Sequence, residues 1–209
     1  MKIVIATHNM DKLLELKNAL EEFNKKIDFL SLLDFPEIGD IDESGKTLEE
    51  NALIKASEVN RITGLPSISD DTGLEVDALH GKPGVFTARY AGENCSYLDN
   101  VNKLLDDLST VPIPNRTAKF KTVMAYVDTN IKLTEEGVAE GVITRSAVGE
   151  YGFGYDPIFF IPEANKTFAE MDINQKKLFS HRGKAVKNIV ISLCANLDNF
   201  NQTISKEIA

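Results

Sequence analysis

The sequence predicts an α/β domain in which helices flank a mixed β-sheet, and three patterns favour this class. A short apolar strand at residues 2–6 runs through a polar turn into a helix whose leucines recur at helical spacing. Residues 117–128 and 132–143 have the composition and spacing of two strands joined as a hairpin. Residues 184–200 carry an apolar stripe that is typical of a helix packed on a sheet.

The composition is that of a globular protein with a sizeable core. Hydrophobic residues make up 43% of the 209 positions and charged residues 26%, so we expect one domain over residues 1–209, a length that also allows two lobes. No stretch reaches the roughly 18 apolar residues that a membrane helix needs. Residues 1–5 are too short for a signal peptide, so we expect a cytoplasmic protein without a membrane partner.

The charge balance and the cysteines exclude further classes. A net charge of −9 makes the chain a poor nonspecific binder of nucleic acid, because neutralising backbone phosphates dominates such binding. We therefore expect any nucleotide ligand to be small and to carry its own metal ion. The two cysteines, Cys95 and Cys194, are far apart and have no ligand spacing, so neither a disulfide framework nor a metal site is indicated there.

The elements of the first half follow from local signals. Residues 28–35 have the composition of a second strand, and residues 36–45 form an acidic loop. Thr47 and Glu50 have the spacing of a capping box, which predicts a helix start, and Gly64 ends that helix.

Later elements follow in the same way. Residues 66–69 predict a strand that leads into an adjacent acid pair. Ser96 and Asp99 form a second capping box, which starts a helix over 96–108. Residues 158–161 are a short apolar strand.

The acid pair, Asp70 and Asp71, is the strongest single signal of chemistry. Neighbouring side chains in a strand point to opposite faces, so both reach one ligand only if the chain bends, and Thr72-Gly73 allows a bend at the strand end. One carboxylate could then hold Mg²⁺ while the other orients water. The plainer alternative is that one aspartate caps the following turn and the other is solvated.

Two lysines and the acidic loop could complete such a site. Lys12 lies in the first turn of a helix, where a basic side chain opposes the helix dipole, and this favours a phosphate partner. Lys55 is a second phosphate candidate, although a lysine there is more often a surface residue. Asp42 or Glu43 could share a metal ion with Asp71, although such a loop alone is more often a solvated face.

Two stretches could recognise a base. Residues 153–156 combine aromatic rings, a glycine and a carboxylate, and aromatic faces stack on bases. Their plainer reading is a glycine turn into a core strand. Residues 180–183, just before the last helix, offer donors for a base carbonyl or a phosphate. A Ser-His pair there could also suggest acyl transfer, but the sequence has no G-x-S-x-G elbow.

Taken in order, these stretches resemble the inosine triphosphate pyrophosphatase family, also called Ham1-like, over nearly the whole chain. The matching stretches are ATHN at 6–9 with Lys12, TLEENA at 47–52 with Lys55, SDDTGL at 69–74, GKPGV at 81–85, ARY at 88–90, GFGYDPIF at 152–159 and SHRG at 180–183. Each is moderate evidence, and their number and order together are specific.

The resemblance implies a fold and a reaction. The fold is an elongated mixed sheet flanked by helices, with a central cleft between two lobes, and members are usually homodimers. The reaction is Mg²⁺-dependent hydrolysis of noncanonical purine nucleoside triphosphates (dITP, ITP and XTP) to the monophosphate and pyrophosphate, which cleanses the nucleotide pool.

The resemblance also implies roles for individual residues. It makes Asp71 a metal ligand and proton acceptor, with Glu43 or Asp42 as the second metal ligand, and puts Asp70 and Lys55 at supporting catalytic positions. The implied contacts to substrate are Thr7, His8, Asn9, Met10, Asp11 and Lys12 for the triphosphate, Thr72, and, for the base, Phe153, Gly154, Tyr155, Asp156, Lys176, His181 and Arg182. His8 and Asp11 stand where many members carry glycine.

Two rival functions stay open. One is a Maf-like pyrophosphatase acting on modified pyrimidine nucleotides, whose signature motifs differ from the stretches quoted above. The other is a nucleotide sensor without turnover, which need not keep an acid pair together with Lys12 and Lys55. Pyrophosphate release from a panel of nucleotides discriminates between them.

Overall fold

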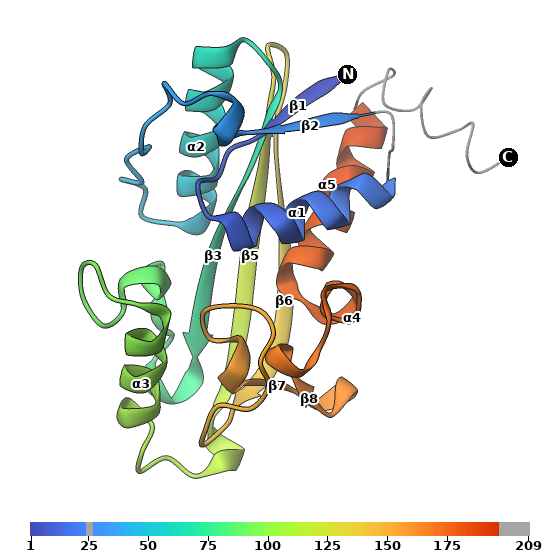
Figure 1. Cartoon of the computed structure of the whole chain (residues 1–209). Coiled ribbons are helices and arrows are strands. Elements are labelled where there is room, and N and C mark those ends of the chain that lie inside the picture. Colours follow the sequence, from blue (N-terminus) through green and yellow to red (C-terminus); the bar gives the residue numbers. More distant parts are fainter. Residues whose placement is uncertain (24–26, 197–209) are drawn as a thin grey trace, which may run out of the picture. The chain divides into compact units, whose positions relative to one another are not determined.

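The structure, a computed structural model, describes residues 1–23 and 27–196 (Figure 1). Its helices are α1 (Met10–Phe23), α2 (Leu48–Thr63), α3 (Tyr97–Asp107), α4 (Ile173–Phe179) and α5 (His181–Asn196). Its strands are β1 (Lys2–Ile5), β2 (Asp28–Ser31), β3 (Ser67–Val76), β4 (Lys82–Gly84), β5 (Thr117–Val127), β6 (Lys132–Ile143), β7 (Phe159–Ile161) and β8 (Lys166–Thr167).

The strands of the described residues form one mixed sheet in the order β2-β1-β3-β5-β6-β7-β8, with β4 paired to β3. Strand β1 runs parallel to both β2 and β3, whereas β4 is antiparallel to β3. Strands β6, β7 and β8 pair antiparallel. The predicted class, a mixed sheet flanked by helices, is confirmed.

The chain divides into two compact units. Unit 1 comprises Met1–Asp71, Thr122–Gly137 and Arg182–Ala209, and unit 2 comprises Thr72–Lys121 and Val138–His181. Strands β3, β5 and β6 contribute residues to both units. One domain over residues 1–209 stays a prediction.

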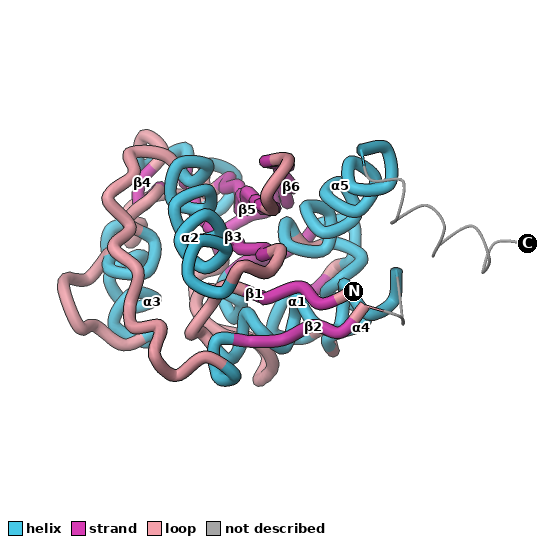
Figure 2. Tube along the Cα trace, turned by 90° about the horizontal axis from the view of Figure 1, so that it is seen from above, coloured by secondary structure: helices cyan, strands magenta, loops and turns pink. Residues whose placement is uncertain are grey.

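In unit 1, helices cover both faces of the strands. Alternation along β1 sends Ile3 and Ile5 into a core with α1 and α5, and sends Val4 into a second core with Val59 of α2. Figure 2, which looks down on the molecule, shows α2 and α5 on opposite sides of β1 and β3. The part of β3 that belongs to unit 1, residues 67–71, therefore lies between two helical layers, and a side chain there faces one layer or the other.

Unit 2 has its own core. Phe120, Phe159 and Phe168 pack together, with ring centroids 4.7 Å apart for the first two and 5.2 Å apart for the last two. Leu104 of α3 belongs to the same cluster. The buried Arg116 donates to the carbonyl oxygens of Val111, Thr144 and Leu108, so this arginine serves the fold of the unit.

The predicted helix starts agree with the structure. The Thr47 hydroxyl accepts from the Glu50 backbone N–H at the start of α2, and Gly64 ends that helix in the left-handed conformation with φ 66°. Ser96 and Asp99 form a complete capping box at the start of α3. Both signals are local in sequence, which is why periodicity and cap residues located them.

The predicted strand over 28–35 is too long. Strand β2 ends at Ser31, and Leu32–Asp34 form a 3-10 turn. The Ser31 hydroxyl accepts from the Leu33 backbone N–H, and the Asp34 carboxylate accepts from the Ser31 backbone N–H. These local bonds compete with the sheet and end the strand.

The predicted closing helix begins too late. Helix α5 starts at His181, so the stretch 180–183 forms the helix start and does not precede it. The predicted end, residues 197–200, lies outside the described residues. Helix α4, which the periodicity did not reveal, begins at the cap residue Asp172.

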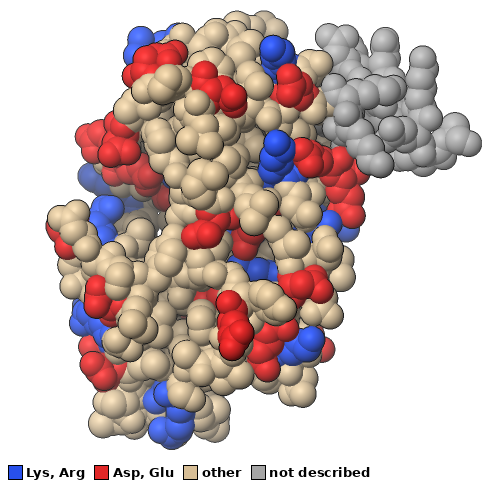
Figure 3. Space-filling view, in the orientation of Figure 1, with Lys and Arg blue, Asp and Glu red and all other residues tan. Residues whose placement is uncertain are grey.

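Charge and hydropathy show no feature of a membrane span. None of the helices in residues 1–23 and 27–196 combines the length and the apolar character that crossing a bilayer requires. Figure 3 shows acidic and basic side chains intermingled over one face of the molecule.

Candidate functional site

The bend at Thr72-Gly73 that would allow both aspartates to reach one ligand does not occur. Strand β3 continues through Thr72 and Gly73 to Val76, because Leu74–Val76 pair with β4. Asp70 and Asp71 therefore keep the alternation of a strand and point to opposite faces. Each carboxylate has its own set of partners within unit 1.

Asp70 faces α1 and α5, on the same side of the strand as Ile68. Its carboxylate accepts from Arg182 at 3.2 Å (Nε) and 3.0 Å (Nη2), and it lies 3.4 Å from the Lys12 Nζ. Arg182 also binds Glu15 of α1. Burial alone would raise the pKa of Asp70, but Lys12, Arg182 and Lys55 outweigh it and hold that pKa far below its usual value.

Lys12 is held at this carboxylate by the start of α1. The Asn9 side chain accepts from the Lys12 backbone N–H at 3.0 Å, and the Thr7 hydroxyl accepts from the Asn9 backbone N–H at 3.2 Å. Burial lowers the pKa of Lys12, the Asp70 carboxylate raises it, and the positive charges of Lys55 and Arg182 lower it, with the net effect a lowered pKa. The half-buried ammonium group therefore pairs with Asp70 and lies near two other cations, which a bound phosphate would help to neutralise.

Asp71 faces the opposite layer, toward α2. Along the same edge of β3, the hydroxyl groups of Ser67 and Ser69 donate to the α2 carbonyl oxygens of Ala56 and Ala52. These two bonds fix the strand against the helix. They bring the Asp71 carboxylate to the α2 side chains described next.

The Asp71 carboxylate accepts from Asn51 Nδ2 at 3.2 Å and from Lys55 Nζ at 3.3 Å. Lys55 Nζ also lies 3.2 Å from Glu43 Oε1. Burial disfavours the charged form of Lys55, but Asp71, Asp70 and Glu43 outweigh it and raise the pKa of the ammonium group. Glu43, Lys55 and Asp71 thus form one contact group, which we call the carboxylate–lysine cluster.

The acidic loop is tied to α2 close to this cluster. The Gly45 backbone N–H donates to Asn51 Oδ1 at 2.8 Å, and the Lys46 backbone N–H donates to Glu50 Oε2 at 2.5 Å. A Cβ atom added at Gly45 would lie 2.5 Å from Asn51 Oδ1, so this close approach requires glycine. Asn51 joins the loop to Asp71, because its amide contacts both.

The cluster has the donors that a magnesium ion uses. Mg²⁺ binds hard oxygen ligands and commonly takes one or two carboxylates together with substrate phosphates. Asp71 and Glu43 supply two carboxylates that already share a cation, Lys55 Nζ. Within residues 1–23 and 27–196, the protein alone gathers no group of three or more His, Cys, Asp or Glu side chains suited to a metal ion. The fit is therefore to a site completed by substrate.

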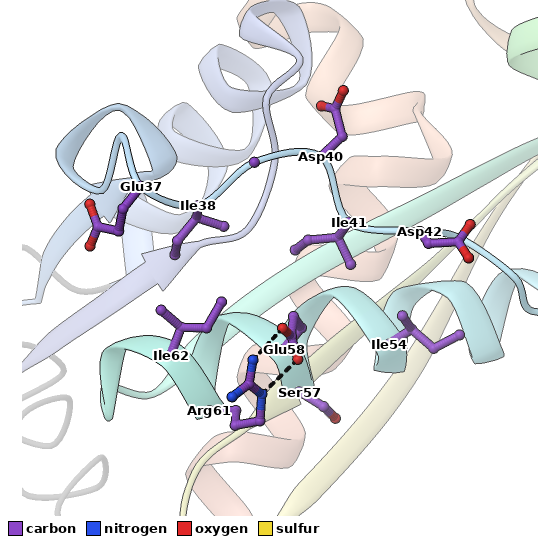
Figure 4. Close-up of a pocket in the computed structure, with 11 residues that line it drawn as sticks. Glu37, Ile38, Asp40, Ile41, Asp42, Ile54, Ser57, Glu58, Arg61 and Ile62 are labelled. Atoms are coloured by element: carbon purple, nitrogen blue, oxygen red, sulfur yellow. Dashed lines mark hydrogen bonds and ion pairs between the residues drawn. The ribbon is translucent and has the colours of Figure 1, made fainter.

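Asp42 lies elsewhere. It lines a pocket of about 550 Å³ between the loop at 37–42 and helix α2. Figure 4 shows the isoleucines of the loop and of the helix pointing toward one another across this pocket, with Arg61 hydrogen-bonded to Glu58. Of the two alternatives for a metal ligand, Glu43 is the one that contacts Lys55.

The remaining residues of the 7–12 stretch do not gather at Lys12 Nζ. His8 Nε2 lies 3.2 Å from the Ile38 carbonyl oxygen, and His8 Nδ1 lies 3.8 Å from Asp40. Met10 and Asp11 are exposed. Their roles toward a triphosphate stay predictions.

In unit 2, a second group forms around Asp156. Its carboxylate accepts from the Phe153 backbone N–H at 2.8 Å and pairs with Lys176 Nζ. The Lys176 Nζ lies 5.0 Å from the centroid of the Phe153 ring and 5.6 Å from that of Phe168. A Cβ atom at Gly152 would collide with Asp156, so glycine is required at that turn, where φ is 74°.

His181 lies near this group within unit 2. Its ring stacks on Phe120 with centroids 4.5 Å apart, and it lies 6.0 Å from Phe168, which Lys176 also contacts. Tyr155, by contrast, is a core residue whose hydroxyl donates to the Thr87 carbonyl oxygen. Gly154 has φ 60° and open space where a Cβ atom would stand.

Arg182 belongs to unit 1 and Thr72 to unit 2. The Arg182 guanidinium belongs to unit 1, where it binds Asp70 and Glu15. Thr72 is half-buried in β3. Recognition of the base by Arg182 and contact of Thr72 with substrate stay predictions.

Sequence reasoning missed two residues of these groups. Glu15, one turn along α1 from Lys12, binds an arginine that is 167 positions away, so no local pattern reveals it. Tyr97, at the start of α3, has its ring 5.8 Å from that of Phe153. The available sequence signal for Tyr97 was an aromatic residue directly after the helix cap Ser96.

Comparisons with known proteins agree on one family. A sequence profile of the Ham1 family matches residues 3–191. The dITP/XTP pyrophosphatase of Elusimicrobium minutum is 49% identical over 193 residues, which cover 90% of this chain and 98% of that protein. The protein of the same name from Geobacter sulfurreducens is 48% identical over 88% of this chain and 92% of its own length.

Solved structures give the same result. A HAM1 protein from Coxiella burnetii superposes with a TM-score of 0.82 at 39% identity, covering 93% of this chain and 99% of that one. The Staphylococcus aureus Ham1 protein has the same TM-score at 35% identity, covering 94% of this chain and 100% of its own. The motifs, the fold and these matches together show that the chain belongs to the Ham1 family.

Proposed function

We propose that the protein hydrolyses dITP, ITP and XTP to the nucleoside monophosphate and pyrophosphate. The observation that carries this proposal is the carboxylate–lysine cluster, with a second, half-buried lysine, Lys12, whose Nζ lies 3.4 Å from the adjacent Asp70 carboxylate. Two cations held near one another and beside carboxylates suit a polyphosphate that brings its own metal ion. Relatives named dITP/XTP pyrophosphatase support the same reaction.

The two aspartates take different tasks in this mechanism. Asp70 is flanked by two cations and its pKa is held low, so it is a weak proton acceptor and serves to hold Lys12 and Arg182 in place. Asp71 accepts a hydrogen bond from the attacking water and takes its proton as the water adds to phosphorus. Pyrophosphate then leaves as the phosphorus–oxygen bond to it breaks.

The lysines act on charge. Lys12 and Lys55 neutralise the negative charge on the triphosphate and on the departing pyrophosphate. A magnesium ion held by Asp71 and Glu43, when bound, would add further neutralisation of the phosphate oxygens. We include magnesium in the proposal because these two carboxylates suit it. A homodimer and a cytoplasmic location stay predictions of the sequence.

Base choice has a physical basis in unit 2. Hypoxanthine and xanthine carry a carbonyl acceptor at position 6, where adenine carries an amino donor. The Lys176 ammonium group has three donors and is held beside Phe153 by Asp156, so it can pair with a carbonyl and would oppose an amino group. A donor left without an acceptor makes rejection strong.

A substrate panel tests the proposal. Pyrophosphate release should be measured from ITP, dITP, XTP, GTP, ATP and dUTP, with Mg²⁺ and with EDTA. We expect Mg²⁺-dependent release from the first three and slow release from the rest. Guanine shares the carbonyl at position 6, so slow release from GTP requires that the pocket disfavour its 2-amino group. Equal turnover of all six would contradict the assignment of base recognition. Nucleotide binding without release would support a sensor.

A further inference from the structure

The aromatic contact between Tyr97 and Phe153 is the feature of unit 2 that no sequence motif accounts for. The two ring centroids are 5.8 Å apart and the planes are inclined at 43°. Tyr97 is 45% exposed, and Phe153 is half-buried. A tilted contact of this kind stabilises the relative orientation of two rings, in addition to the burial of their surface.

The backbone of Phe153 is held by the carboxylate of Asp156. Asp156 accepts from the Phe153 backbone N–H and also pairs with Lys176, whose ammonium group lies 5.0 Å from the Phe153 ring centroid. The flanking glycines, Gly152 and Gly154, have φ values of 74° and 60° and no side chain that could pack against the ring. The Tyr97 ring supplies a restraint from a helix.

We propose that Tyr97 is a positioning residue that holds the Phe153 ring in the orientation that stacks on the purine base. This inference rests on the proposed function and deepens it, because it assigns a specificity role to a residue outside the family's motif stretches quoted above. Tyr97 acts through Phe153 and takes no part in the reaction at phosphorus.

Helix α3 provides a rigid base for this contact. Tyr97 is its first residue, and the cap is closed by Ser96 and Asp99 through bonds of 3.2 Å and 2.8 Å that do not involve the Tyr97 side chain. A substitution at Tyr97 therefore removes the ring without removing the cap. We expect Tyr97→Ala to fold as the wild type does, which circular dichroism and the melting temperature check.

The test compares Tyr97→Ala with Tyr97→Phe, which keeps the ring. Leu98→Ala is the matched control, because Leu98 is the next residue of the same helix turn and is 65% exposed. We expect Tyr97→Ala to raise KM for ITP by roughly 3- to 10-fold with kcat within about twofold, the range of an aromatic pair contact. Tyr97→Phe should restore the wild-type KM, and Leu98→Ala should not change it.

Inorganic tripolyphosphate, used as a competitive inhibitor, separates the base from the phosphates. We expect its inhibition constant to be the same for wild type and Tyr97→Ala, since it has no base to stack. An unchanged KM in Tyr97→Ala would overturn the inference and leave the proposed function intact. So would an equal loss of tripolyphosphate binding. A wild-type protein that releases no pyrophosphate from any nucleotide would overturn both.

Discussion

Asp70 and Asp71 are neighbours in the chain, yet their carboxylates lie on opposite faces of strand β3. Asp70 Oδ2 is 3.0 Å from Arg182 Nη2, whereas Asp71 Oδ1 is 3.3 Å from Lys55 Nζ. The strand does not bend between them, because its ladder continues to Val76. A pair that suggests one shared site in sequence is therefore two residues with separate partners, and their variants should behave differently.

Asp71→Asn should remove activity and leave the fold intact. The variant keeps the size of the side chain and its contact with Asn51, but it loses the proton acceptor. We expect kcat for ITP to fall by about 10²- to 10⁴-fold, the usual contribution of a general base. Steady-state pyrophosphate release checks this, with circular dichroism as the control for folding. A loss of less than about tenfold would contradict the role of Asp71.

Asp70→Asn should lower the stability of the fold. It leaves the buried Arg182 and the half-buried Lys12 without the carboxylate that both contact. We expect the free energy of unfolding to fall by about 3–5 kcal/mol, as when one partner of a buried ion pair is removed. Urea denaturation measures this, and Asp11→Asn, at an exposed position of the same α1 turn as Lys12, is the control. Equal stability of the two variants would contradict the prediction.

The low pKa of Asp70 gives this stability a pH dependence with a definite sign. The folded carboxylate keeps its charge at a pH where the unfolded one, with a pKa near 3.8, takes up a proton. Falling pH therefore favours unfolding. The contribution of Asp70 to the free energy of unfolding is complete above the pKa of the unfolded carboxyl group and is lost as the pH falls below it. We expect the stability difference between wild type and Asp70→Asn to be constant from about pH 5 to 7 and to shrink below about pH 4. A difference that grows on acidification would contradict the assignment.

Glu43 and Asp42 offer a matched test of the proposed magnesium site. Only Glu43 of these two neighbours contacts Lys55, and Asp42 lines the pocket against α2. We expect Glu43→Gln to raise the Mg²⁺ concentration that gives half-maximal activity by about 10- to 100-fold, because an oxygen ligand loses its charge. Asp42→Asn should leave that concentration unchanged. If Asp42→Asn raised this Mg²⁺ concentration and Glu43→Gln did not, Asp42 would be the metal ligand.

Lys12→Gln should weaken substrate binding. Lys12 is a half-buried lysine whose pKa is lowered by burial and by neighbouring positive charges, in spite of Asp70, so a phosphate group would stabilise its charged form. We expect KM for ITP to rise by roughly 10- to 100-fold, the value of a hydrogen bond to a charged group. Lys17→Gln is the control, since Lys17 lies on the same helix with a half-exposed side chain. Similar effects of the two substitutions would contradict a specific role for Lys12.

Local signals made much of the fold predictable. Cap residues located the starts of α2 and α3, because a hydroxyl bonds a backbone N–H three positions away. Period-two patterning located β5, whose alternate residues Met124 and Tyr126 pack in one core, and β6 followed as its partner strand. The prediction for strand β3 was too short because it placed the end of the strand near Gly73. Pairing with β4 extends the strand beyond that residue.

The parts of the site that depend on distant residues could not be predicted from residue patterns. Glu15 and Arg182 contact each other although they are 167 positions apart, and no sequence pattern around either residue indicates the contact. The separation of Asp70 from Asp71 depends on the pairing of β3 with β4, and the contact of Glu43 with Lys55 depends on the path of the acidic loop. The family resemblance supplied candidate positions, and the structure supplied their partners.

The most direct test of the proposed function is to identify the products formed from ITP. Purified protein should be incubated with ITP and Mg²⁺, and the nucleotides and phosphates separated by anion-exchange chromatography over the time course. We expect IMP and pyrophosphate in equal amounts from the first time point, with no IDP. Accumulation of IDP and inorganic phosphate would show attack at the terminal phosphorus and would contradict the pyrophosphatase mechanism.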